Sequence, residues 1–169
     1  MIVLSVSALI VGCGSKAGSN QSSDLYKSFY VGQNVNQYFI KPLTFENDSG
    51  DLIADFTFKI TESGTDSTTI NYTILSDDII KSLDSLTLSN STISIPFTVK
   101  ERFFLERDGD QYRVRFSSLL PNSDFFTLFQ DSNWEVTTYN SGKSANYKSD
   151  GDTKDKIQEL KKDLILLVD

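Results

Sequence analysis

Leu52–Glu62 reads Leu-Ile-Ala-Asp-Phe-Thr-Phe-Lys-Ile-Thr-Glu, an alternation of apolar and polar side chains. Successive side chains of a strand point to opposite faces of a sheet. One face of this segment therefore carries Ala54, Phe56, Phe58 and Ile60. A turn cluster of Asn, Asp, Ser and Gly precedes it at residues 47–51. The segment predicts a strand with one face in the core.

Similar segments lie on both sides of this strand. Short aromatic or aliphatic runs predict strands at Tyr26–Val31, Gln37–Phe45 (broken by Pro42), Thr69–Leu75 and Ile93–Val99. Residues 77–86 are ambiguous, because their Ile and Leu spacing fits a helix and their end could begin a strand. Aromatic residues make up 12% of the chain, which favours half-buried pleated surfaces.

The segment from Arg102 to Ser117 predicts a hairpin around Asp108-Gly109-Asp110. With Gly109-Asp110 as the loop, the expected cross-strand pairs are Arg107 with Tyr112, Glu106 with Arg113, and Phe104 with Arg115. We expect the core face to carry Phe103, Leu105, Tyr112, Val114 and Phe116. The opposite face then carries Arg102, Glu106, Arg113 and Arg115.

The last third of the chain predicts a second hairpin and a helix. Residues 125–130 and 134–139 are expected to pair as strands, and residues 140–151 to form a polar loop. Asp152 is a suitable N-cap for a helix over residues 153–168, where Ile157, Leu160, Leu164 and Leu167 form one stripe. We therefore expect a single mainly β domain over residues 25–169. Its fold is an antiparallel β-sandwich or open barrel of about eight strands with a C-terminal amphipathic α-helix.

This order of elements looks like that of the lipocalins, although their Gly-x-Trp signature is absent near the first predicted strand.

The chain opens with an uncharged apolar run over residues 1–11, too short to span a bilayer as a helix. It leads into Ile10-Val11-Gly12-Cys13, which resembles the lipobox of bacterial lipoproteins. The resemblance implies removal of residues 1–12 as a signal peptide and attachment of a lipid to Cys13. A typical signal peptide opens with Lys or Arg, and here none precedes Lys16.

Residues 14–23 contain no core-forming side chain and are typical of a flexible tether, so residues 13–24 are expected to link the lipid to the domain. The resemblance implies a protein of the cell envelope. The anchor would lie in the outer membrane of a diderm bacterium, or otherwise on the outer face of the cell membrane.

Composition narrows the classes of function. The chain has no histidine, the commonest general base, and one cysteine, so neither a Cys-His mechanism nor a Cys-based zinc site is available. The net charge of −7 disfavours nucleic acid as a partner. No phosphate-binding glycine loop and no calcium-loop spacing occurs. The sequence therefore predicts no cofactor, no metal site and no catalytic residue.

Two groups of residues are candidates for binding. All four arginines fall on the predicted hairpin, and Arg102, Arg113 and Arg115 on one face would suit an anion or an acidic partner. Glu101 and Glu106 could instead neutralise them across the strands. A second set, Phe104, Phe125, Phe129 and Trp134, could line an apolar pocket or simply fill the core.

Three functions remain open from the sequence. The first is a membrane-anchored, non-enzymatic module that binds a protein or a small molecule. The second is a structural subunit of a cell-envelope or secretion assembly. The third is a carboxylate-dependent hydrolase. A closed apolar cavity would favour the first, a long open edge the second, and an acid pair about 5–9 Å apart in a cleft the third.

Overall fold

The computed structural model describes residues 23–61 and 67–168, with side chains as far as Leu164. In this part of the chain the strands are β1 (Tyr26–Tyr30), β2 (Asn36–Asn47), β3 (Gly50–Ile60), β4 (Ser67–Ser76), β5 (Ser85–Ser89), β6 (Ser94–Thr98), β7 (Glu101–Asp108), β8 (Gln111–Pro121), β9 (Glu135–Asn140) and β10 (Lys143–Ser149). The helices are α1 (Asn122–Leu128) and α2 (Gly151–Val168).

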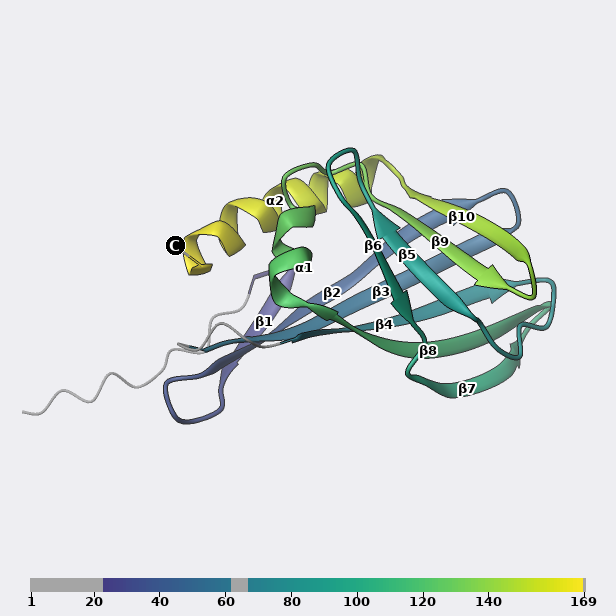
Figure 1. Ribbon diagram of the computed structural model, residues 1–169, viewed down its shortest axis with the longest axis horizontal. Coiled ribbons are helices and arrows are strands. Elements are labelled where there is room, and N and C mark those ends of the chain that lie inside the picture. Colours follow the sequence, from purple (N-terminus) through teal and green to yellow (C-terminus); the bar gives the residue numbers. More distant parts are fainter. Residues whose placement is uncertain (1–22, 62–66, 169) are drawn as a thin grey trace, which may run out of the picture.

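All of these strands belong to one antiparallel sheet, in the order β6-β5-β9-β10-β2-β3-β4-β8-β7, with β1 paired to β2. The sheet curls into a half-barrel, and both helices lie at one end of it (Figure 1). Strand β6 leads directly into β7 through Val99 and Lys100, and the Lys100 backbone N–H donates to the Ser117 carbonyl oxygen (2.9 Å), but in the described residues no ladder pairs β6 with β7. The expected mainly β fold with a C-terminal helix is confirmed, with ten strands rather than about eight in the described residues.

The alternation of β3 determines how the sheet folds around the core. Leu52, Ala54, Phe56 and Phe58 are buried, while the residues between them are partly exposed. The strand pairs with β2 on one side and β4 on the other. Its inner face therefore meets side chains from the whole curled sheet. The strand break expected at Pro42 is a register shift in β2 between Ile40 and Leu43, since proline has no N–H to give to the ladder.

The hairpin of β7 and β8 has the expected register around Gly109-Asp110, including the pairs Glu106 with Arg113 and Phe104 with Arg115. A bulge between Arg102 and Phe104 was not expected. The extra residue changes which way the preceding side chains point. The prediction that Phe103 lies in the core is therefore wrong, because its exposed fraction is 51%.

Two predictions about the C-terminal third are wrong. Residues 122–128 form helix α1 rather than the first strand of a hairpin, because Phe125 and Leu128 make a helical stripe that packs onto the core. Residues 143–149 form strand β10 rather than a polar loop, since β9 and β2 pair with it. The ambiguous residues 79–84 have no regular structure and lead into β5.

Helix α2 closes the barrel end that α1 also covers. Its N-terminus is capped by Asp150, not Asp152: the Asp150 carboxylate accepts the backbone N–H of Thr153 (2.7 Å). This hydrogen bond lowers the pKa of Asp150 from its ordinary value. Three members of the expected stripe, Ile157, Leu160 and Leu164, are buried, and the side chain of the fourth, Leu167, lies outside the described residues.

Candidate functional site

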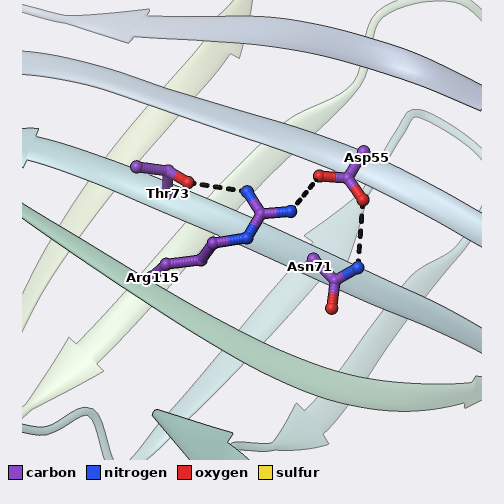
Figure 2. Close-up of polar contacts among 4 residues, drawn as sticks. All are labelled: Asp55, Asn71, Thr73 and Arg115. Carbon is purple, nitrogen blue, oxygen red and sulfur yellow. Dashed lines mark hydrogen bonds and ion pairs between the residues drawn. The ribbon is translucent and has the colours of Figure 1, made fainter. Parts of the chain in front are cut away.

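On the arginine-bearing face of the sheet, acidic side chains of the same chain balance much of the arginine charge. Arg115 on β8 reaches across β4 to Asp55 on β3, and its Nη2 donates to the carboxylate at 2.5 Å (Figure 2). Its Nη1 donates to Thr73 Oγ1 (2.8 Å), and Asn71 Nδ2 donates to the other Asp55 oxygen (3.0 Å). Both charged side chains are about three quarters buried. This guanidinium therefore already holds an anion of the chain itself.

The other two arginines of the predicted set lie on different faces of the hairpin. Arg113 sits 5.9 Å from the centre of the Phe104 ring, with Glu106 and Asp108 within 4 Å. Arg102 pairs with Phe116, and its Nη1 donates to the Lys81 carbonyl oxygen at 2.5 Å. The bulge at residue 103 thus separates Arg102 from the other two. The structure brings Arg113 and Arg115 to one face and does not bring Arg102 there.

Three of the four candidate pocket aromatics pack against one another in the core. Phe125, Phe129 and Trp134 are at most 3% exposed, with ring centres 4.9–6.4 Å apart. The Trp134 indole N–H donates to the carbonyl oxygens of Leu128 (2.9 Å) and Asp131 (2.8 Å). Phe104 belongs to the outer face of the hairpin instead. These side chains fill the barrel end beneath α1, as the alternative interpretation of the sequence expected.

A hollow of about 460 Å³ lies at the other end of the half-barrel, which we call the open-end hollow. Three loops surround it: the β2–β3 turn, the β4–β5 connection and the β9–β10 hairpin, all at the right of Figure 1. Its lining comprises Asn47, Ser49, Ser76, Asp78, Ile79, Ile80, Leu83, Thr138, Asn140, Lys143, Ser144, Ala145 and Tyr147.

The open-end hollow combines an apolar floor with a polar rim. Leu83 and Tyr147 are buried below it, whereas Asp78 and Lys143 are exposed at its mouth. Burial raises the pKa of Tyr147 above its ordinary value, and the side chain of Asn47 is its hydrogen-bond partner. A volume of this size with convergent polar groups suits a small amphipathic molecule. The open-end hollow therefore offers a ligand both apolar contacts and hydrogen bonds.

Sequence reasoning missed the open-end hollow because its walls come from three segments far apart in the chain. One local signal was available, the pair Ile79-Ile80 inside a polar connection without regular structure. In the structure, Ile79 is 49% exposed and lines the open-end hollow together with Ile80.

Cys13 and the other residues of the lipobox lie outside the described residues. Comparison with known proteins found no matching family model, no similar curated protein and no similar solved structure. Among residues 23–61 and 67–168, no group of three or more His, Cys, Asp or Glu side chains could hold a metal ion. None of the described helices is long and apolar enough to cross a bilayer.

Proposed function

We propose that this chain is a lipid-anchored protein of the cell envelope whose domain acts as a non-enzymatic binding module. The lipobox-like sequence ending at Cys13 supports the anchor. The open-end hollow supports the binding role and carries this proposal, because its volume and mixed lining suit a small amphipathic ligand.

The arrangement of the domain fits this role. Strand β1, the first element of the described chain, starts at the barrel end that carries the helices (Figure 1). The open-end hollow lies at the opposite end. A domain tethered through Cys13 would therefore hold the hollow away from the bilayer, where a ligand from the aqueous compartment can reach it.

Two variants test the proposal. Cys13→Ala should release the protein from the membrane fraction of its host without altering its melting temperature. Ala145→Trp places an indole in the open-end hollow and should eliminate any small molecule that co-purifies with the protein in native mass spectrometry. Tyr139→Trp is the matched control, because this side chain belongs to the same hairpin but not to the lining of the hollow.

Membrane retention of Cys13→Ala with a bare Cys13 in the wild-type protein would refute the anchor. Equal ligand masses in wild type and Ala145→Trp would refute the hollow as the binding site.

An assembly role is the second candidate, because β7 is a sheet edge eight residues long with mostly exposed side chains. An edge of this kind presents unpaired backbone groups to which a partner strand can add. Glu106→Pro on β7 would weaken such an assembly and leave the open-end hollow intact.

A further inference from the structure

The hairpin of β1 and β2 gathers half of the large exposed apolar side chains of the described chain. Phe29, Tyr30, Val31 and Phe39 are 39–50% exposed. Phe29 and Phe39 contact each other edge to face, with ring centres 5.6 Å apart. The tip of this hairpin projects beyond the rest of the half-barrel, at the lower left of Figure 1. Solvent-exposed aromatics grouped at a projecting tip indicate a contact surface.

Cations flank the two rings on the same face of the sheet. Residues directly opposite each other in a ladder point to the same side. Phe39 is opposite Lys27, and Gln37 lies between Phe29 and Lys59 in the next row. Both lysines are exposed. The face therefore alternates aromatic rings and ammonium groups.

The charge of this hairpin differs from that of the whole chain. No Asp or Glu occurs from Leu25 to Phe45, although the chain carries 23 of them and a net charge of −7. A hollow of about 300 Å³ adjoins the face, and its described lining is Gln37, Thr57, Phe58, Lys59, Ser67 and Thr69. This lining offers hydrogen-bond donors and one cation to an anionic group.

We propose that the outer face of the β1–β2 hairpin is a second, non-covalent membrane contact, which inserts Phe29 and Phe39 among the headgroups of an anionic bilayer. Aromatic rings favour the interface between lipid and water, and lysines beside them attract anionic headgroups. The hollow beside Lys59 would receive one headgroup phosphate. The inference rests on the proposed lipid anchor, which brings this end of the domain to the bilayer.

The dimensions of the tether and hairpin agree with this contact. Ten residues, Gly14 to Ser23, can reach at most about 35 Å. Strand β1, with five residues, carries the hairpin tip about 17 Å from the end of the tether. Both the tether and the hairpin can therefore touch one bilayer at the same time.

The test uses the full chain with Phe29→Trp, bound to vesicles of 7:3 phosphatidylcholine and phosphatidylglycerol with brominated acyl chains. The emission of the introduced indole should shift to the blue and lose most of its intensity. Tyr139→Trp places an indole at the opposite end of the domain, and its fluorescence should persist. The buried Trp134 is common to both variants and cancels in the comparison.

Charge and apolar variants separate the two parts of the contact. Adding Lys27→Glu and Lys59→Glu to the Phe29→Trp protein should weaken the affinity of the hairpin for the anionic bilayer by about tenfold or more. Phe29→Ser with Phe39→Ser should release the hairpin, as measured by a spin label on Gln33→Cys. Lys81→Glu with Lys100→Glu changes the net charge equally, at positions outside both the hairpin and the lining of the open-end hollow, and should have little effect.

Unquenched emission from the introduced indole on vesicle-bound protein would overturn the inference. So would quenching that is equal on pure phosphatidylcholine, or a hairpin-dependent dimer in sedimentation, which would assign the face to a second copy. Mass spectrometry of residue 13 keeps the two proposals separate. An unlipidated Cys13 together with quenching in the Phe29→Trp protein would refute the anchor and leave the hairpin contact standing.

Discussion

The Arg115 guanidinium and the Asp55 carboxylate form an ion pair that crosses an intervening strand. Arg115 lies on β8 and Asp55 on β3, with β4 between them. The carboxylate also accepts from Asn71, and the guanidinium donates to Thr73. The pair thus connects three neighbouring strands on the outer face of the half-barrel (Figure 2).

Removing one partner of this pair should destabilise the protein. We expect Asp55→Ala to lower the free energy of unfolding by about 1–3 kcal/mol, because it leaves a mostly buried guanidinium without its anion. A double-mutant cycle with Arg115→Ala, followed by urea denaturation, measures the coupling, which we expect at about 1–2 kcal/mol. Purely additive effects would contradict a stabilising pair.

The exposed pair of Arg113 and Glu106 supplies the control. Their nitrogen and oxygen atoms are 3.9 Å apart, and both side chains are about half exposed. Such pairs contribute about 0–1 kcal/mol. Arg113→Ala with Glu106→Ala should therefore show a coupling energy near the lower end of that range.

Gly50 has no room for a side chain. Its φ is +143°, and a Cβ there would lie 2.2 Å from the Leu75 carbonyl oxygen. We expect Gly50→Ala to destabilise the fold by more than about 2 kcal/mol, since backbone strain and a backbone clash add. Thermal denaturation followed by circular dichroism measures the effect.

Gly109→Ala is the matched control for this substitution. Gly109 also has a positive φ, +64°, but nothing lies within 4 Å of its Cβ position. Gly109→Ala should therefore lower the free energy of unfolding by about 1 kcal/mol, from backbone conformation alone. Equal losses for the two variants would show that the contact with Leu75 is unimportant.

The parts of the fold that the sequence predicted are those with strong local periodicity. Strand β3 buries alternate residues, so its pattern alone identifies it. Strand β10, in contrast, reads Lys-Ser-Ala-Asn-Tyr-Lys-Ser and buries only Tyr147 and Ser149. Its strand conformation comes from pairing with β9 and β2, and those partners are invisible in a local pattern.

In the candidate sites, too, contacts between residues close in sequence could be predicted, and contacts between distant residues could not. The pairing of Glu106 with Arg113 followed from the length of the hairpin loop. The pairing of Arg115 with Asp55 did not, because the two residues are 60 positions apart. The open-end hollow was beyond prediction for the same reason. Helix α1 carried a readable signal, since Phe125, Leu128 and Phe129 follow helical spacing.

Asp131 should make stability depend on pH at the acid end. Its carboxylate accepts hydrogen bonds from Ser91 Oγ (2.6 Å) and from the Asn133 backbone N–H (3.2 Å), and these lower its pKa to about 2. A carboxylate with a depressed pKa stabilises the fold above its unfolded pKa of about 3.9. That contribution is lost as the pH falls through the folded value.

We therefore expect Asp131→Asn to be less stable than wild type at pH 6. The difference should shrink between pH 4 and pH 2, as measured by urea midpoints along the pH series. The site is largely exposed, so the difference is small. Asp152→Asn is the control, because the wild-type Asp152 side chain forms only an exposed ion pair with Lys156 on the helix surface. A constant difference for Asp131→Asn from pH 6 to pH 2 would rule out a role for its charge.

Trp134 joins the aromatic core to the loop after α1. We expect Trp134→Ala to lower the free energy of unfolding by about 3–5 kcal/mol, because it empties a site that is 1% exposed beside Phe125 and Phe129. Trp134→Phe should cost less, since a ring still fills most of the space. It still removes the N–H that binds the Leu128 and Asp131 carbonyl oxygens. Tyr139→Ala, at a side chain 39% exposed, should cost under about 1 kcal/mol. The melting temperature is measured by circular dichroism. An unchanged melting temperature for Trp134→Ala would show that the aromatic cluster does not stabilise this end of the half-barrel.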